Sequence, residues 1–219
     1  MTQATAFNRS YTGLRADILS LVPAKPRRVL DLGCATGEMG RYLADTFGAE
    51  VWGVEYDGAM AQVARPKLRD VWRADLNKDS LSAFPHGEAY DLIVCGDVLE
   101  HLVDPWRVLR DAAGLLRSGG HIVASLPNIG HFTTLMHLAL LREWPYRDRG
   151  IHDRTHLRFF TRRNLIQLYR QAGLEVEAEK RNLRLWESGS PVDGLARLAD
   201  FPPFRSFVTF QYIHRLRKP

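Results

Sequence analysis

The feature that most constrains this chain is the stretch from Arg28 to Gly37, RVLDLGCATG. An apolar run with the composition of a β-strand carries one acid, Asp31. It then breaks at Gly33 and Gly37, after which a helical pattern begins. Glycines at a strand-to-helix turn let the backbone approach a bound molecule, because no Cβ stands in the way. The stretch therefore predicts an α/β sheet that holds a ligand at the end of its first strand.

A second acid, Glu55, ends the next apolar run of the chain. An acid at the tip of this strand is placed to accept hydrogen bonds from both hydroxyls of a ribose. We therefore expect a nucleoside cofactor, with Cys34 and Ala35 in the turn and Tyr56 after the acid as further contacts.

The spacing of the turn argues against a cofactor recognised by its phosphates. The phosphates of nucleotide cofactors are bound by the patterns G-x-G-x-x-G and G-x-x-x-x-G-K-[ST], and neither pattern occurs in this turn. Asp31 would repel a phosphate, whereas it suits a cationic amino-acid head. The turn thus favours S-adenosylmethionine, with an unrelated α/β protein carrying a glycine-rich turn as the alternative.

Length and composition predict one globular domain over residues 1–219. No apolar run is long enough to suggest a membrane span. The N-terminal MTQATAFNRSY lacks the apolar core of a signal peptide. Cys34 and Cys95 lie in apparent core segments, which suits a reducing compartment and buried rather than nucleophilic thiols. We therefore expect a cytoplasmic protein.

Apolar runs alternate with helical patterns along the chain, which predicts a mostly parallel sheet covered on both faces. Gly119 and Gly120 are expected to end the third helix. The expected strands are Arg28–Leu32, Glu50–Glu55, Val71–Ala74, Tyr90–Cys95, His121–Leu126, Leu174–Lys180 and Ser206–Arg215, and the expected helices are Glu38–Phe47, Gly58–Arg65, Pro105–Leu116 and Arg162–Ala172.

Polar residues at the carboxyl ends of these strands are further candidates for ligand contact, since ligands bind there in open α/β sheets. Asp75 and Leu76 follow the third strand, and Gly96 and Asp97 follow the fourth. Asp75 has an alternative role as the cap of a turn.

The most chemically informative cluster is DVLEHL, which contains Asp97, Glu100 and His101. One turn of helix would place these side chains on one face, and His156 follows later in DRTHLRFFTRR. Three interpretations remain open. The four residues hold Mg²⁺ or a similar divalent ion; His101 or His156 acts as a general base; or the acids cap and salt-bridge a helix start while the histidines pack.

The glycine turn resembles motif I of the class I S-adenosylmethionine-dependent methyltransferases, D/E-x-G-x-G-x-G, with Ala35 at the middle glycine. The resemblance implies a Rossmann-like, seven-stranded, mostly parallel sheet with helices on both faces and an antiparallel last strand. It also implies these contacts with the cofactor: Asp31, Gly33, Ala35 and Gly37 at the methionine end, Glu55 at the ribose, and Asp75 with the amide of Leu76 at the adenine.

The acid-histidine cluster is similar to that of small-RNA 2′-O-methyltransferases, where a glutamate, a Glu-His pair and a later histidine hold a divalent metal. Ubiquinone-pathway O-methyltransferases share a similar Glu-His pair. Carried over by position, the resemblance implies Asp97, Glu100, His101 and His156 as ligands. Asp97 departs from the glutamate of that pattern and has a shorter side chain.

The segment from Leu126 to Gly173 resembles bacterial methyltransferases linked to polysaccharide and glycosyl assembly, relatives of the ubiquinone branch. The shared features are PN-x-x-H, W-x-Y and DRTHLRFFT. The resemblance implies a substrate-side insertion over residues 127–160. Its expected acceptor contacts are His131, Trp144, Tyr146, His152 and Arg154.

Together these features predict an O-methyltransferase acting on a sugar hydroxyl of a glycan, nucleotide sugar or glycosylated metabolite. The alternatives are a quinone or aromatic O-methyltransferase, an RNA 2′-O-methyltransferase, and a catalytically idle S-adenosylmethionine-binding regulatory subunit. The net charge of +5, with eight arginines and three acids between residues 142 and 170, favours an anionic acceptor. Nucleic acid is not expected, because the chain has no recognised RNA-binding module.

Two further segments carry expectations. Residues 1–22 are expected to form a helix that covers the cofactor through Asn8, Tyr11 and Arg15. Residues 183–205 form an insertion between the last two strands, for which a lid, a dimer contact and a long hairpin connection all remain open.

Overall fold

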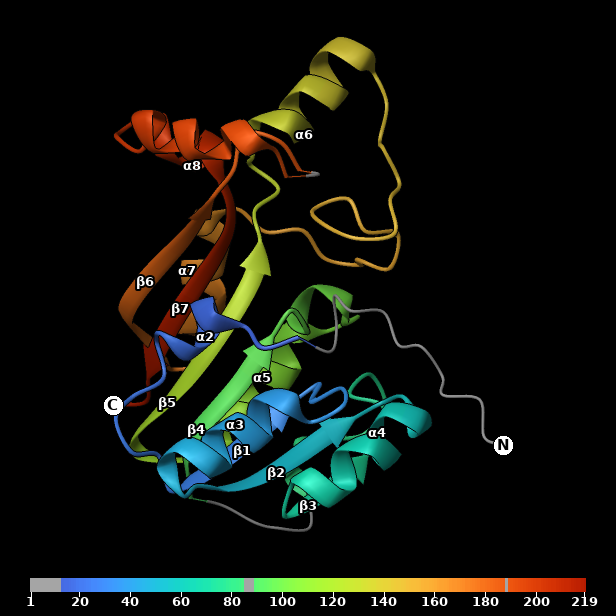
Figure 1. Ribbon diagram of the computed structural model, residues 1–219, viewed down its shortest axis with the longest axis vertical. Helices are drawn as coiled ribbons and strands as arrows, with labels where there is room; N and C mark the ends of the chain where they lie inside the picture. The colour runs from blue at the N-terminus through green and yellow to red at the C-terminus, as the bar shows by residue number, and fades with distance from the viewer. Residues whose placement is uncertain (1–12, 85–88, 188) are drawn as a thin grey trace.

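A seven-stranded sheet forms the centre of the molecule in the computed structural model, which describes residues 13–84, 89–187 and 189–219 (Figure 1). The strand order is β3-β2-β1-β4-β5-β7-β6; β1 to β5 are parallel, and β7 is antiparallel to both of its neighbours. The strands are β1 (Arg28–Leu32), β2 (Glu50–Glu55), β3 (Asp70–Arg73), β4 (Tyr90–Gly96), β5 (Leu116–Pro127), β6 (Glu175–Leu183) and β7 (Thr209–Arg217).

Helices cover both faces of this sheet. Figure 1 shows α2 (Ala16–Leu19), α3 (Glu38–Phe47) and α4 (Gly58–Ala64) on one face, and α5 (Pro105–Leu115) and α7 (Arg162–Gln171) on the other. Because successive strand residues point to opposite faces, Val29 belongs to the same buried cluster as Ile18 of α2, whereas Leu30 belongs to the cluster that contains Leu165 of α7. Burial on both faces explains why the strands are nearly continuous apolar runs.

The predicted fold class is therefore confirmed, and β1, β2 and α3 have the predicted bounds. One prediction at the end of α5 is wrong. The expected glycine stop does not exist, because Leu116 is already extended and begins β5. Gly120 lies within that strand, where an added Cβ would come within 3.0 Å of the Tyr90 carbonyl oxygen.

Four short helices, which the sequence analysis did not predict, lie beyond the ends of β5 and β7. Figure 1 shows α6 and α8 in this region, which we call the cap. The ring of Phe132 meets that of Trp186 at 5.6 Å, so the two insertions contact each other. The cap helices are α6 (Phe132–Met136), the π-helical η4 (His137–Leu141), the 3₁₀-helical η5 (Pro191–Ala199) and α8 (Arg205–Val208).

Within the described part of the predicted N-terminal helix, the structure contains α2. Asn8 and Tyr11 lie outside the described residues. Within those residues, none of the helices has the length and apolar character needed to cross a bilayer.

Gly53, in the middle of β2, sets how closely the loop after β1 approaches the sheet. An added Cβ would lie 2.5 Å from the Cys34 Sγ and 2.9 Å from a Leu68 methyl. We expect Gly53→Ala to destabilise the fold by about 1–3 kcal/mol through overpacking, measured by urea unfolding. The control is Gly114→Ala in α5, where nothing lies within 4 Å of the new Cβ and the helix should gain roughly 0.5–1 kcal/mol. Equal unfolding midpoints for the two variants would contradict this packing role.

Candidate active site

A large cavity of about 1250 Å³ opens at the carboxyl ends of the parallel strands. Its lining includes both the loop after β1 and the acid-histidine cluster after β4. The cavity therefore brings the predicted cofactor site and the predicted chemical site into one space.

The loop after β1 has an unusual backbone. Gly33, Ala35 and Gly37 all have left-handed φ values, of 69°, 47° and 78°. Ala35 thus adopts the conformation expected of the middle glycine of motif I, although an alanine rarely does so. Gly37 is not part of the cavity lining. Its role is packing, since an added Cβ would lie 3.1 Å from the Ala64 backbone.

Two buried acids face the cavity beside this loop. Glu55 accepts hydrogen bonds from the Ala35 and Asp57 amides, both at 2.8 Å, so its carboxylate fixes the left-handed residue and retains free lone pairs. Burial, together with the charge of Glu55, raises the pKa of Asp31 to about 7. A cationic ligand would relieve the repulsion between these two acids, as expected for the methionine end of S-adenosylmethionine.

The other predicted cofactor residues lie around the same space. Asp75 accepts a hydrogen bond from the Asn77 amide at 3.0 Å and pairs with Lys78 at 3.2 Å. These two contacts lower its pKa. Asp75 therefore caps a turn and also faces the cavity. The remaining predicted residues in the lining are Cys34, Tyr56, Leu76, Gly96 and Asp97.

The Asp97 carboxylate is bound by residues other than the predicted metal ligands. It has a φ of 57°, and the 3₁₀ turn η3 (Leu99–His101) begins only after it, so the expected shared helical face does not form. Its carboxylate accepts hydrogen bonds from Ser125 Oγ at 2.7 Å, Gln211 Nε2 at 2.6 Å and the Arg15 guanidinium. Asp97 therefore belongs to a hydrogen-bond network with Arg15, Ser125 and Gln211.

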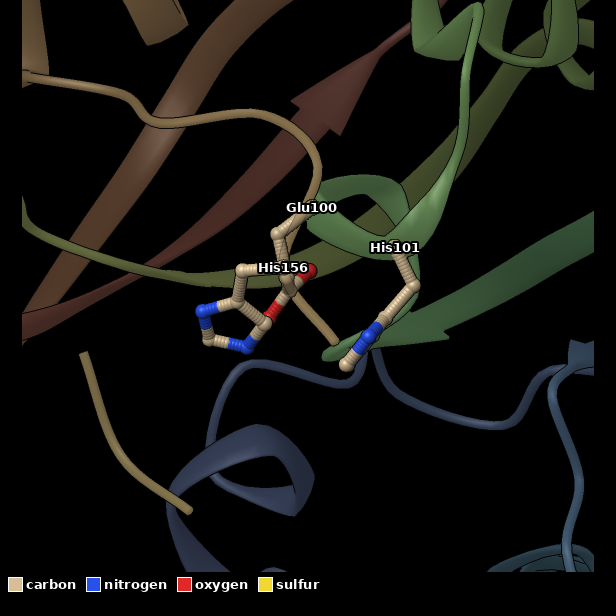
Figure 2. A group of neighbouring side chains, drawn as sticks. All are labelled: Glu100, His101 and His156. Carbon is tan, nitrogen blue, oxygen red and sulfur yellow. The ribbon is translucent and has the colours of Figure 1, made fainter. Parts of the chain in front are cut away.

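The other three predicted ligands converge. Glu100, His101 and His156 each offer a ligand atom within 4.8 Å of the others, and Figure 2 shows their side chains pointing toward one another. Glu100 is only 1% exposed, and its Oε2 has no hydrogen-bond partner within the described residues. Burial and the nearby charge of Asp97 raise the pKa of Glu100 well above its ordinary value. A buried, unpartnered carboxylate oxygen is costly unless a ligand satisfies it.

The histidines are oriented by neighbouring oxygens. His101 Nδ1 lies 3.3 Å from the Thr155 carbonyl and 3.1 Å from its hydroxyl, and His156 Nδ1 lies 3.2 Å from the Ile151 carbonyl. A carbonyl at Nδ1 selects the tautomer with the proton there, which leaves Nε2 as an acceptor. Two such imidazoles beside an unsatisfied carboxylate match a divalent metal site in both chemistry and spacing.

The five residues predicted to contact the acceptor do not line the cavity. His131 is fully buried, with Nδ1 against the Thr133 hydroxyl at 2.8 Å and Nε2 against the Arg184 carbonyl at 2.9 Å. His152 is equally buried, bonded to Glu187 at 2.7 Å and to Thr134 at 3.1 Å. Both histidines have their ring nitrogens occupied and hold the cap together.

The three remaining members of this set are also placed elsewhere. Trp144 packs edge-on against His152 and Phe159, Tyr146 is 72% exposed, and Arg154 pairs with Asp148 on the surface.

Several residues that shape the site were not predicted from the sequence. Ser125 and Gln211 hold Asp97 from β5 and β7, strands that are neighbours in the sheet although far apart in the chain. Such partners leave no local signal in a sequence. The same is true of the lining residues Arg149, Arg184, Glu187 and Asp193.

Comparisons with known proteins agree with this geometry. The family described as "Methyltransferase domain" matches residues 7–179. Two proteins named "Ubiquinone biosynthesis O-methyltransferase" are each 32% identical to the chain: one from Aromatoleum aromaticum over 155 residues, the other from Aeromonas salmonicida over 158. Each match covers 68% of this chain, and it covers 64% and 63% of the relatives, so the chain spans just under two thirds of their lengths.

The fold also has close counterparts among solved structures. A "SAM dependent methyltransferase" from Archaeoglobus fulgidus superposes with a TM-score of 0.66 at 18% identity, covering 96% of this chain and 97% of that one. With the family match and the cavity between motif I and the acid-histidine cluster, the conclusion is that this chain belongs to the methyltransferase domain family and has the class I methyltransferase fold.

Proposed function

We propose that this chain is an S-adenosylmethionine-dependent O-methyltransferase whose acceptor presents two neighbouring oxygens to a divalent metal ion. The observation that carries the proposal is the buried Glu100 oxygen, which has no partner in the described part of the chain and faces His101 and His156 in the same cavity as the Glu55 turn. A catalytically idle subunit would have no use for such a costly arrangement.

Each part of the cavity has a defined task in this proposal. Glu55 accepts from the ribose hydroxyls, and Asp31 receives the cationic amino-acid head. S-adenosylmethionine would supply an electrophilic methyl group for in-line displacement and leave as S-adenosylhomocysteine, and a divalent ion would lower the pKa of the attacking hydroxyl so that its proton passes to solvent. Glu100, His101 and His156 orient the acceptor by holding that ion, and the bond from Thr155 fixes the His101 ring.

The donor set also bears on the choice of metal. Carboxylates suit Mg²⁺ and Mn²⁺, whereas imidazoles suit Fe²⁺ and Zn²⁺. Two imidazoles with one carboxylate therefore favour Mn²⁺, Fe²⁺ or Zn²⁺ over the Mg²⁺ expected first.

The acceptor class follows from the relatives together with this donor set. The name "Ubiquinone biosynthesis O-methyltransferase" supports the aromatic alternative better than the sugar hydroxyl that the sequence analysis favoured. A catechol presents two adjacent oxygens that can bind one metal ion. We therefore propose a catechol-like aromatic acceptor. Methylation of a 2′-hydroxyl when RNA is supplied as the acceptor would instead support the RNA alternative.

Cofactor binding should depend on Glu55. We expect Glu55→Gln to weaken S-adenosylmethionine binding roughly tenfold or more, because hydrogen bonds to a charged acceptor are lost, as measured by calorimetry. The control is Glu50→Gln, an exposed residue of the same strand that pairs with Arg69 outside the cavity lining. An unchanged affinity in Glu55→Gln would contradict the ribose assignment.

Methyl transfer to a catechol should require the metal ligands. We expect Glu100→Gln to lower the rate by roughly 100-fold or more, since even changes to outer-sphere partners cost 10–100-fold. A chelator should abolish activity and Mn²⁺ should restore it. The control is Glu143→Gln, because Glu143 is an exposed residue just after η4 whose side chain is hydrogen-bonded to His137. Activity that survives the chelator yet is lost in the His101→Ala or His156→Ala variant would point to a general base instead.

The pH dependence should report the environment of Glu100. Its raised pKa in the metal-free protein means that protons compete with the metal for this carboxylate at a higher pH than for an ordinary glutamate, so activity at a limiting metal concentration should fall early on the acid side. His156 is not expected to limit this limb, because burial and neighbouring His101 lower its pKa. In the Asp97→Asn variant a charge that raises the pKa of Glu100 is lost, so the acid limb of kcat/KM should shift to lower pH. An unshifted limb would contradict this electrostatic link.

A further inference from the structure

The cavity lining contains Arg15, which is paired with Asp17 and Asp97, and two further arginines, Arg149 and Arg184. We propose that Arg149 and Arg184 form a subsite for an anionic group, a carboxylate or phosphate, on the same acceptor molecule that is methylated. This inference rests on the proposed O-methyltransferase function and specifies its acceptor.

The two acids of the lining that follow Arg184 in the chain already have partners within the protein. Glu187 is already paired with Arg147 at 3.1 Å and with His152 at 2.7 Å. The Asp193 carboxylate accepts from three backbone amides, at 2.8 Å (Leu185), 3.3 Å (Trp186) and 2.8 Å (Ser190).

The acids nearer to β4 also have hydrogen-bond partners within the protein. Asp17 and Asp97 share the Arg15 guanidinium, and Asp153 accepts twice from Thr155. Across the described residues, by contrast, neither Arg149 nor Arg184 is in an ion pair. Arg184 interacts with the charge of Asp193 without a direct ion pair, so both arginines keep donors that a bound anion can use.

The two arginines are brought together by Glu187. Arg149 precedes Gly150, whose φ of 91° places its backbone so close to the Glu187 carboxylate that an added Cβ would lie 2.6 Å from Oε1. Arg184 Nη1 lies 3.4 Å from the Glu187 carbonyl oxygen. Both arginines therefore flank one residue of the cavity wall.

Arg184 is also pre-positioned for recognition. Its guanidinium lies 4.2 Å from the centre of the Phe210 ring, a cation–π contact that restrains it and leaves most of its N–H donors available. Its backbone is fixed by hydrogen bonds to Val208 and to His131 Nε2. Guanidinium groups held in this way suit carboxylate and phosphate oxygens.

The subsite is linked to the metal ligands through the chain. Arg149 and His156 belong to one loop, and Asp153 in that loop binds Thr155, the partner of His101. A single acceptor could therefore place its hydroxyls at Glu100, His101 and His156 and its anionic group at Arg149 and Arg184.

The test compares three catechols that differ in one substituent: 3,4-dihydroxybenzoate, its neutral isostere 3,4-dihydroxybenzamide, and 3,4-dihydroxyphenylphosphonate. Methyl-transfer kinetics with Mn²⁺ give KM and kcat. Calorimetry with S-adenosylhomocysteine gives binding. The variants are Arg149→Gln, Arg184→Gln and the double variant, and the control is Arg154→Gln, a surface arginine of the same loop outside the cavity lining.

We expect KM for an acidic probe to be at least about tenfold lower than for the amide, as charge-assisted hydrogen bonds imply. The double variant should remove this preference while leaving KM and kcat for the amide unchanged, and Arg154→Gln should keep the preference. The acid with the larger gain identifies carboxylate or phosphate as the natural group.

Two outcomes would count against the proposals, and they differ. Equal KM and binding for the acids and the amide in the wild type, or a preference that survives the double variant, would overturn the anion subsite and leave the methyltransferase function intact. Failure of all three catechols both to bind and to react would overturn the proposed acceptor class itself.

Discussion

The carbonyl oxygen of Glu100 accepts hydrogen bonds from the amides of Leu157 and Arg158, at 2.8 and 3.0 Å. These two bonds dock the loop after the cap onto the turn after β4, and every part of the chemical site depends on that docking. They bring His156 beside Glu100, and they carry Thr155 to the ring of His101. Because the bonds use only backbone atoms, the loop can be held in place while the Glu100 side chain stays free for a ligand.

The fold and the cofactor-binding half of the cavity were predictable because the sequence patterns that indicate them are local. A strand, a glycine turn and a helix follow one another in the chain, and the acid of the next strand completes the site. Asp97 shows where such reasoning ends. Spacing placed it with Glu100 on a helical face, but a left-handed backbone and three partners from distant segments turn its carboxylate elsewhere. The sheet order that supplies Ser125 and Gln211 has no counterpart in the linear pattern.

The cap shows a second limit of sequence reasoning. The histidines and aromatics after β5 stand out because of their residue types, yet a histidine in a sequence does not reveal whether its ring nitrogens are already bonded. His131 and His152 are bonded at both nitrogens. They act on the site indirectly, since one fixes the backbone of Arg184 and the other holds Glu187. The two histidines expected to contact the acceptor are therefore buried residues that position Arg184 and Glu187, which were not predicted from the sequence.

The position of β7 between β5 and β6 also has a consequence for the order in which the protein is built. Phe210 and Gln211 enter the cavity from this strand, and the bond from Gln211 to Asp97 spans 114 residues. Closing such a long loop costs more chain entropy than forming the turn after β1, where the bond from Ala35 to Glu55 spans 20 residues. A nascent chain can therefore assemble the nucleoside half of its cavity while the acceptor half is still open. The substrate wall is completed only when the last strand inserts.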